Sequence, residues 1–223
     1  VPAGMNVCVS LSITLSNGVA GGTWSTASSA VTVGSSSGRV TGVSGGTAVI
    51  SYTLPPGCTG TTTVTINTAP PPISGTLAIC SGATTTLSNA TSGGTWTSGN
   101  ITLAVVGLAT GVVTGIGTGT ANITYSLGGA CRTSATLTVN PLPAPITGNT
   151  TVCLGAATTL SNTVAGTWAS GNTAVATIGA ATGMVTSLSL GTSVITFTNT
   201  TGCTKTTTVT VNNLAPITGM TTL

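Results

Sequence analysis

The sequence predicts an all-β protein made of tandem β-sandwich domains, and three observations carry this prediction. Apolar and polar residues alternate over short runs, as at Leu11, Ile13 and Leu15, which is typical of half-buried strands. Gly-Gly, Asn-Gly, Ser-Gly and Thr-Gly pairs separate these runs, and no segment has a helical apolar period with caps. The same pattern then occurs three times along the chain.

Cysteines and aromatic residues define the repeat. The first cysteines of the three pairs are Cys8, Cys80 and Cys153, and the second ones are Cys58, Cys131 and Cys203. The aromatic residues recur at two further positions: Trp24, Trp96 and Trp168, then Tyr52, Tyr125 and Phe197. We therefore expect domains at 1–69, 70–143 and 144–214. Residues 215–223 are expected to be the first strand of a fourth repeat, because Ala-Pro-Ile at 215–217 repeats the opening of the third domain.

Each repeat has about 70 residues and about seven predicted strands, which is the pattern of an immunoglobulin-like sandwich. A unit of this size is near the lower limit at which a hydrophobic core alone is sufficient. Two cysteines per repeat therefore predict one stabilising disulfide in each domain.

The composition excludes several classes of function. Lys and Arg together account for three of the 223 residues, and the chain has no Asp, Glu or His. Asp, Glu and His are the usual general acids, general bases and metal ligands. We therefore expect no enzyme activity, no cofactor and no metal site. Arg39, Arg132 and Lys205 are isolated from one another, so no nucleic-acid partner is expected. No stretch approaches 18 consecutive apolar residues, which predicts no membrane span in this segment. No signal peptide is recognisable, so we expect a mature or internal piece of a longer protein.

The third repeat carries a recognisable progression of motifs. Gly-Thr-Trp-Ala-Ser-Gly-Asn-Thr-Ala-Val-Ala-Thr-Ile (166–178) is followed by Ala-Thr-Gly-Met-Val-Thr (181–186) and Gly-Thr-Ser-Val-Ile-Thr-Phe (191–197). This progression, repeated around Trp24 and Trp96, resembles the bacterial immunoglobulin-like group 2 domain. The resemblance implies tandem repeats in the stalks of large surface adhesins, including invasin- and intimin-like proteins and the giant adhesins of gliding bacteria. The chain departs from that family in having two cysteines per repeat and no acidic residues in its loops.

Six cysteines allow fifteen pairings. Pairs within repeats would be Cys8–Cys58, Cys80–Cys131 and Cys153–Cys203, whereas pairs across the junctions would be Cys58–Cys80 and Cys131–Cys153. In an immunoglobulin-like sandwich, we expect the start of the first strand and the turn into the last strand to lie at the same pole. This expectation favours pairing within repeats, and it predicts an oxidising, extracellular or cell-surface location.

The same residues favour a structural role. All six aromatic residues occupy the two repeating positions, so we expect them to fill the cores, and none is left for stacking on a sugar. We therefore expect a non-catalytic, disulfide-braced stalk or filament segment of a surface protein. The alternative is an adhesion module that binds carbohydrate or ice. Because the edges lack charged residues that oppose association, other copies or adjacent repeats are the expected partners, end to end or side by side. A host or surface receptor would be bound elsewhere in the full-length protein.

Overall fold

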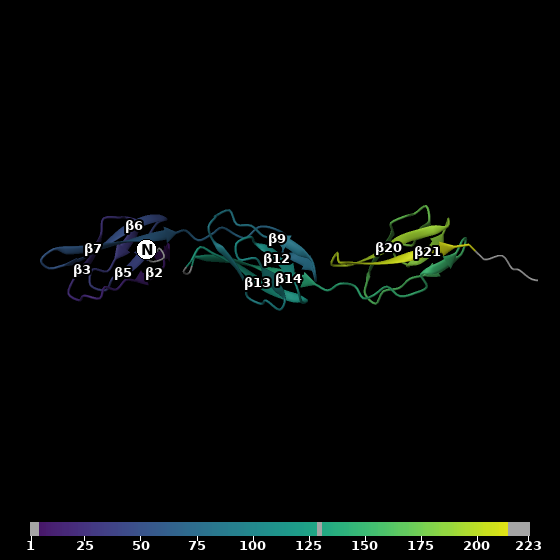
Figure 1. Ribbon diagram of the computed structural model, residues 1–223, viewed down its shortest axis with the longest axis horizontal. Coiled ribbons are helices and arrows are strands. Elements are labelled where there is room, and N and C mark those ends of the chain that lie inside the picture. The colour runs from purple at the N-terminus through teal and green to yellow at the C-terminus, as the bar shows by residue number, and fades with distance from the viewer. Residues whose placement is uncertain (1–4, 129–130, 214–223) are drawn as a thin grey trace, which may run out of the picture. The chain divides into compact units, whose positions relative to one another are not determined.

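The computed structural model describes residues 5–128 and 131–213, and every regular element in this part of the chain is a β-strand (Figure 1). Six sheets form three sandwiches, each with one four-stranded and one three-stranded sheet. The predicted all-β, immunoglobulin-like class is therefore confirmed. Residues 215–223, which were expected to open a fourth repeat, lie outside the described residues.

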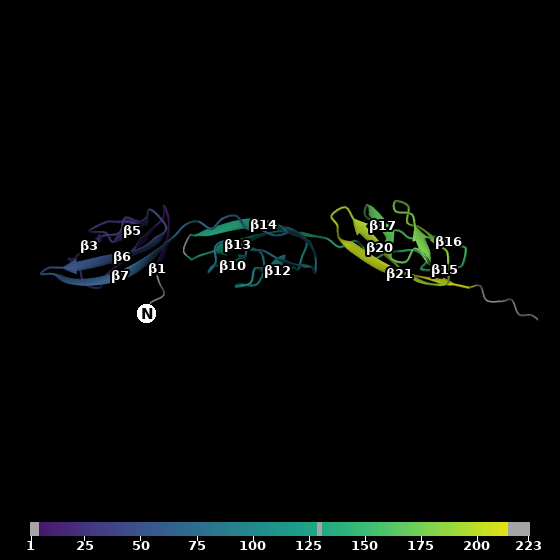
Figure 2. The same cartoon turned by 90° about the horizontal axis from the view of Figure 1, so that it is seen from above.

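The first sandwich shows the topology that the other two repeat. Its four-stranded sheet has the order β1-β7-β6-β3, and its three-stranded sheet has the order β2-β5-β4. The seven strands are β1 (Met5–Cys8), β2 (Ser12–Thr14), β3 (Thr23–Thr26), β4 (Val31–Val33), β5 (Arg39–Gly42), β6 (Gly46–Leu54) and β7 (Cys58–Asn67). The antiparallel β6–β7 hairpin is the longest element of this sandwich (Figure 2).

The second and third sandwiches use the same strand order. In the second, β8-β14-β13-β10 faces β9-β12-β11, and in the third, β15-β21-β20-β17 faces β16-β19-β18. The strands of the second are β8 (Ala78–Cys80), β9 (Thr84–Thr86), β10 (Thr95–Ser98), β11 (Ala104–Val106), β12 (Val112–Gly115), β13 (Gly119–Ser126) and β14 (Arg132–Asn140). Those of the third are β15 (Thr151–Cys153), β16 (Ala157–Thr159), β17 (Gly166–Ser170), β18 (Ala176–Ile178), β19 (Met184–Ser187), β20 (Gly191–Asn199) and β21 (Thr204–Asn212).

In the first and third sandwiches, the first strand runs parallel to the last strand. In β1 and β7 the register places Cys8 opposite Asn67, and in β15 and β21 it places Cys153 opposite Asn212. The other strand pairings of these two sandwiches, and those among β9 to β14 in the second, are antiparallel. The cysteine that ends the first strand therefore lies beside the end of the last strand and not beside its beginning.

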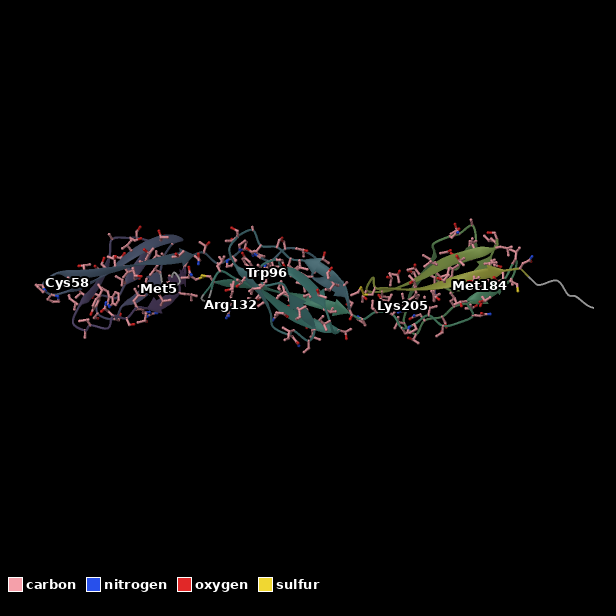
Figure 3. The ribbon with its side chains drawn as sticks, in the orientation of Figure 1. Met5, Cys58, Trp96, Arg132, Met184 and Lys205 are labelled. Atoms are coloured by element: carbon pink, nitrogen blue, oxygen red, sulfur yellow. A yellow bond between two sulfur atoms is a disulfide. The ribbon has the colours of Figure 1, made fainter. Side chains whose placement is uncertain are left out.

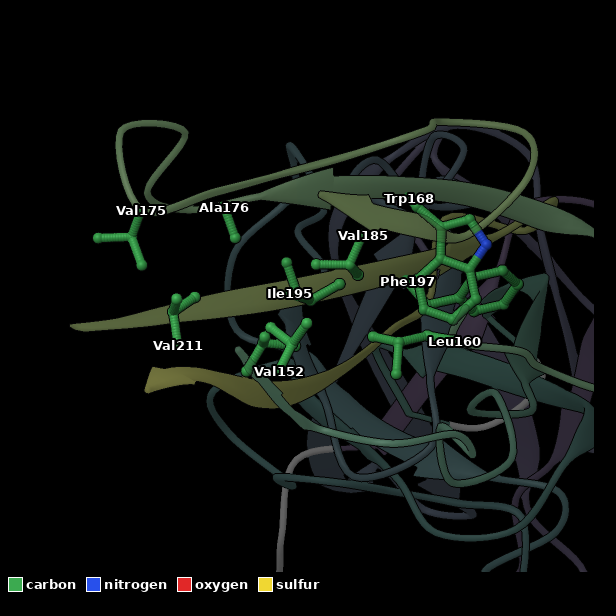
Figure 4. Packing of buried hydrophobic residues seen from close by; sticks show 10 residues of the cluster. Val152, Leu160, Trp168, Val175, Ala176, Val185, Ile195, Phe197 and Val211 are labelled. Atoms are coloured by element: carbon green, nitrogen blue, oxygen red, sulfur yellow. The ribbon is translucent and has the colours of Figure 1, made fainter. Parts of the chain in front are cut away.

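Alternating apolar residues of the long strands form the cores. On β20, Ile195 and Phe197 are fully or almost fully buried, whereas Val194 between them is 49% exposed. These residues pack with Leu160 and Trp168 in the core of the third sandwich (Figure 4). A strand with one buried and one exposed face is what the period-two pattern predicts.

A glycine makes room for the tryptophan of each core. Gly183 follows the turn before β19 with φ +70°, and a Cβ there would meet the carbonyl oxygen of Leu160 and the indole ring of Trp168. Gly38 and Gly111 have the same conformation and the same neighbours in the other sandwiches. Only glycine has both the conformational freedom and the small size that these positions require.

The chain divides into two compact units. One contains β1–β7 and β9–β14, and the other contains β15–β21 together with Ile79–Ser81. Within the described residues, no helix is long and apolar enough to cross a membrane.

Candidate functional site: the cysteines that join successive repeats

The second cysteine of each repeat closes the turn of the longest hairpin. Cys58 is the register partner of Leu54, four residues earlier. In the other two sandwiches, the backbone N–H of Leu127 donates to the carbonyl of Cys131 (2.8 Å), and that of Asn199 donates to the carbonyl of Cys203 (2.9 Å). In each sandwich the cysteine pairs with the residue four positions before it, so Cys58, Cys131 and Cys203 are structurally equivalent. We call them the hairpin cysteines.

The first cysteine of each repeat ends the first strand beside an asparagine of the last strand. The residue after each of these cysteines donates its backbone N–H to the carbonyl oxygen of that asparagine. These hydrogen bonds are Val9 to Asn67 (3.0 Å), Ser81 to Asn140 (2.9 Å) and Leu154 to Asn212 (2.9 Å). Cys8, Cys80 and Cys153 are therefore also equivalent, and we call them the strand-end cysteines.

Two disulfides join these two kinds of position between successive repeats. Cys8 is bonded to Cys131 and Cys80 is bonded to Cys203. The Cα atoms are 5.3 Å and 5.7 Å apart, within the usual range for a disulfide. Both bonds span 123 residues, so the strand-end cysteine of one repeat is linked each time to the hairpin cysteine of the next.

The expected pairing within repeats is therefore wrong. Cys8 lies opposite Asn67 at the end of β7, whereas Cys58 begins that ten-residue strand. Nine strand residues at about 3.3 Å each put the two cysteines roughly 30 Å apart. A disulfide requires Cα atoms within about 7 Å, so the parallel first strand rules out a bond inside the repeat.

The junction pairs Cys58–Cys80 and Cys131–Cys153 are also not formed. Instead of one disulfide in each predicted domain, the chain has two disulfides, and each links two successive sandwiches.

Two cysteines remain as free thiols among the described residues. Cys58, the hairpin cysteine of the first repeat, and Cys153, the strand-end cysteine of the third, are both exposed. Their bonded counterparts Cys131 and Cys203 are completely buried, and Cys8 is 5% exposed. The exposure of a cysteine thus differs between the bonded and the free copies of one site.

The six aromatic residues form one pair of tilted rings in each sandwich. The ring centroids of Trp24 and Tyr52 are 4.6 Å apart, and the corresponding distance is 4.7 Å in the pairs Trp96–Tyr125 and Trp168–Phe197. Five of the six are buried, and Trp24 is half-buried. No aromatic ring of the chain is therefore fully exposed.

The charged and hydroxyl side chains form no reactive cluster. Arg39, Arg132 and Lys205 are exposed and lie on β5, β14 and β21 of three different sandwiches. In the described part of the chain, no three Cys residues or other metal-binding side chains come together. A shallow hollow recurs beside the aromatic pair of each sandwich, and its polar lining consists of Ser, Thr and Asn side chains and backbone groups.

Comparison with known proteins finds distant structural similarity only. No family model matches the chain, and no curated protein matches it. A fragment of intimin bound to the intimin-binding domain of its translocated receptor is 19% identical, with a TM-score of 0.43, over 65% of this chain and 64% of that one. The S-layer protein rSbsC(31-844) is 18% identical, with a TM-score of 0.32, over 88% of this chain and 36% of that one. Protocadherin Gamma B2 domains 3–6 are 8% identical, with a TM-score of 0.28, over 93% of this chain and 70% of that one.

Proposed function

We propose that this chain is a structural segment, a stalk or filament, of an extracellular surface protein, made of repeats like the bacterial immunoglobulin-like group 2 domain. The observation that carries the proposal is that the disulfides join successive repeats. A bond inside a small domain stabilises that domain alone. A bond from the strand end of one repeat to the hairpin of the next keeps the array continuous, which is the property a tether needs.

The chemistry of the cysteines supports an extracellular location. Disulfides persist in oxidising compartments and are rare where thiol reductants are abundant. Four of the six cysteines are paired, and the pairing repeats from one junction to the next. A regular series of covalent junctions is useful only where they stay oxidised.

The side-chain inventory supports a non-catalytic role. The chain has no Asp, Glu or His, and its many hydroxyl groups have no adjacent general base of these types. The carbohydrate-binding alternative gains no support, because the rings that would stack on a sugar are paired in the cores.

The decisive chemical test uses the three tryptic sites. The free thiols are first alkylated, and the unreduced chain is then denatured and cleaved after Arg39, Arg132 and Lys205. Bonds between repeats hold residues 1–39, 40–132 and 133–205 together as one species, and reduction separates them. If mass spectrometry instead finds residues 133–205 released without reduction, the bonds are inside the repeats and the proposal loses its basis.

The location is tested on intact cells. Antibodies against residues 5–213 are expected to label the surface of unpermeabilised cells of the source organism, and external protease should remove the label. A cytoplasmic marker serves as the control for cell integrity. Labelling that requires permeabilisation would contradict the proposal.

A further inference from the structure

We propose that Cys58 and Cys153 are the two complementary halves of a third inter-repeat disulfide, which joins this three-repeat unit to further repeats at both ends. Cys58 would receive the strand-end cysteine of a preceding repeat. Cys153 would bond to the hairpin cysteine of a following repeat. The inference rests on the proposed structural function and specifies its partner: another sandwich of this type, in the same polypeptide or in a second copy.

Cys58 and Cys153 occupy sites equivalent to those of the bonded cysteines. Leu54 and Cys58 are related in the same way as Leu127 and Cys131, which is a bonded hairpin site. Cys153 is held by the hydrogen bond from Leu154 to Asn212, just as Cys8 is held by the hydrogen bond from Val9 to Asn67. Cys8 and Cys80 are the strand-end cysteines that are followed by another repeat, and both are bonded. Cys131 and Cys203 are the hairpin cysteines that are preceded by another repeat, and both are bonded as well.

The bonded and the free hairpin cysteines also differ in burial. The bonded hairpin cysteines Cys131 and Cys203 have no exposed surface, whereas Cys58 is exposed at the tip of the β6–β7 hairpin (Figure 3). The exposed Cys58 thiol is not part of the buried core of its own sandwich. Its position is explained by the bond that its two equivalents make.

The strand-end site of the third repeat is also fixed in place. The hydroxyl of Ser187 lies 2.8 Å from the carbonyl oxygens of both Cys153 and Ala156, and Ser187 is 2% exposed. In the first repeat, Gly42 of β5 takes the place of Ser187 and has no hydroxyl to make these hydrogen bonds. The backbone at Cys153 is thus held by a buried hydrogen-bonding side chain while its thiol stays exposed.

The two halves determine the geometry of assembly. A hairpin site and a strand-end site are different surfaces, so a bond between them is a heterologous contact. After two units have joined in this way, one hairpin cysteine and one strand-end cysteine remain unbonded, at opposite ends of the pair. Further units can therefore be added by the same contact, all in the same direction. A symmetric dimer would need Cys58 to meet Cys58, and no strand-end or hairpin cysteine in the chain bonds to one of its own kind.

The bond forms by thiol–disulfide exchange with an external disulfide, either a small molecule or an oxidoreductase. The Cys58 thiolate attacks that disulfide and gives a mixed disulfide, releasing the first external thiol. The thiolate of the strand-end cysteine then attacks the Cys58 sulfur and releases the second. The two cysteines lose two electrons and two protons, and the external disulfide becomes two thiols.

The test uses the chain itself as the probe, because it carries one site of each kind. The purified protein is incubated in a glutathione redox buffer, quenched by alkylation and analysed on non-reducing gels and by peptide mass spectrometry. We expect a ladder of multimers in which the Cys58–Cys153 cross-link is at least about tenfold more abundant than Cys58–Cys58 and Cys153–Cys153 together. Random collision would give equal amounts of the mixed and the combined symmetric links, and that result would overturn the proposal.

Three variants make the test specific. Cys58→Ser and Cys153→Ser should each fail to form ladders, and an equal mixture of the two should stop at one dimer linked through the remaining cysteines. The control moves the thiol to another exposed position of the same repeat, in the double variant Cys58→Ser with Ser36→Cys. This control should lose the ladder although its thiol reacts with a maleimide as fast as Cys58 does. A ladder of equal yield would overturn the proposal.

Protein recovered from its native surface shows which source supplies the partner. A second copy attaches the Cys153 peptide to Cys58, and a further repeat of the same polypeptide attaches a peptide of different sequence. Both outcomes support the proposal, and free thiols at both positions overturn it. That failure would leave the tryptic pattern and the surface labelling untouched, so it is distinguishable from failure of the proposed function.

Discussion

Tyr125 holds two backbone groups with one hydroxyl. The oxygen accepts a hydrogen bond from the N–H of Gly94 (2.8 Å) and donates one to the carbonyl of Thr91 (2.5 Å). Tyr52 does the same with Gly22 and Val19 in the first sandwich. The spacing of the aromatic residues allowed their ring positions to be expected from the sequence. The hydroxyl contacts were not foreseen, because the loop groups that they bind have no distinguishing side chain and Phe197 stands at the same position in the third repeat.

Gly183 offers the sharpest test at the scale of one residue. Gly183→Ala should lower the free energy of unfolding by about 3 kcal/mol, because the added Cβ adds a steric conflict with Leu160 and Trp168 to an unfavourable positive φ. Gly155→Ala is the matched control, since Gly155 also has a positive φ (+80°) but no neighbour within 4 Å. It should cost about 1 kcal/mol. Denaturant unfolding followed by tryptophan fluorescence measures both, and equal costs would contradict the role assigned to the close contact.

The direction of one short strand decides how the cysteines pair. Alternation, turn residues and the repeat predict where strands form and which face is buried. The structure buries Leu15, as predicted, but Leu11 is 41% exposed. The alternation of apolar and polar residues does not show whether β1 runs parallel or antiparallel to β7. Either direction buries the same alternate side chains of β1. The expected pole for Cys8 was therefore wrong by the length of a strand, and the disulfide pairing with it.

The faces of β20 are tested by neighbouring substitutions. Ile195→Ala should cost about 3–4 kcal/mol of unfolding free energy, because it leaves a cavity in a fully buried position. Val194→Ala is the control on the opposite face, 49% exposed, and should change the free energy by less than about 0.5 kcal/mol. Equilibrium denaturation measures both values. A larger effect at Val194 would contradict the register of this sheet.

For the whole molecule, stability should depend on reduction far more than on pH or chelators. The chain has no Asp, Glu or His, so it lacks the side chains whose usual pKa values lie between about 4 and 7. Equal proton binding in the folded and unfolded states makes the free energy of unfolding independent of pH in that range. The melting temperature should therefore change by less than about 2 °C between pH 4.5 and 7, with or without EDTA.

Dithiothreitol should lower that melting temperature by several degrees. Each disulfide closes a loop of more than 100 residues, and such a loop is worth about 4–5 kcal/mol in the chain-entropy model. Scanning calorimetry on oxidised and reduced protein gives the comparison. A pH-dependent melting temperature that ignores the reductant would contradict the expectation.

The overlapping bonds should also limit how far the unfolded chain extends. Between Cys8 and Cys203, the shortest covalent route crosses to Cys131, returns to Cys80 and crosses again, using roughly 50 residues in place of nearly 200. At about 3.5 Å per residue, the stretched length between these points is about 180 Å with the bonds and about 680 Å without them. Single-molecule pulling in oxidising and reducing buffer measures the difference. The double variant Cys8→Ser with Cys131→Ser should give an intermediate length in oxidising buffer.

The overlap of the two bonds gives the chain tolerance to single proteolytic cuts. A break anywhere between Cys8 and Cys131 is bridged by the first bond, and a break anywhere between Cys80 and Cys203 is bridged by the second. The proline-rich connections near Pro71 and Pro143 are included, although bonds inside the repeats would leave both unprotected. In the stretch shared by the two loops, the chain is bridged twice. Separating the chain into two pieces between Cys8 and Cys203 therefore takes at least two separate bond-breaking events.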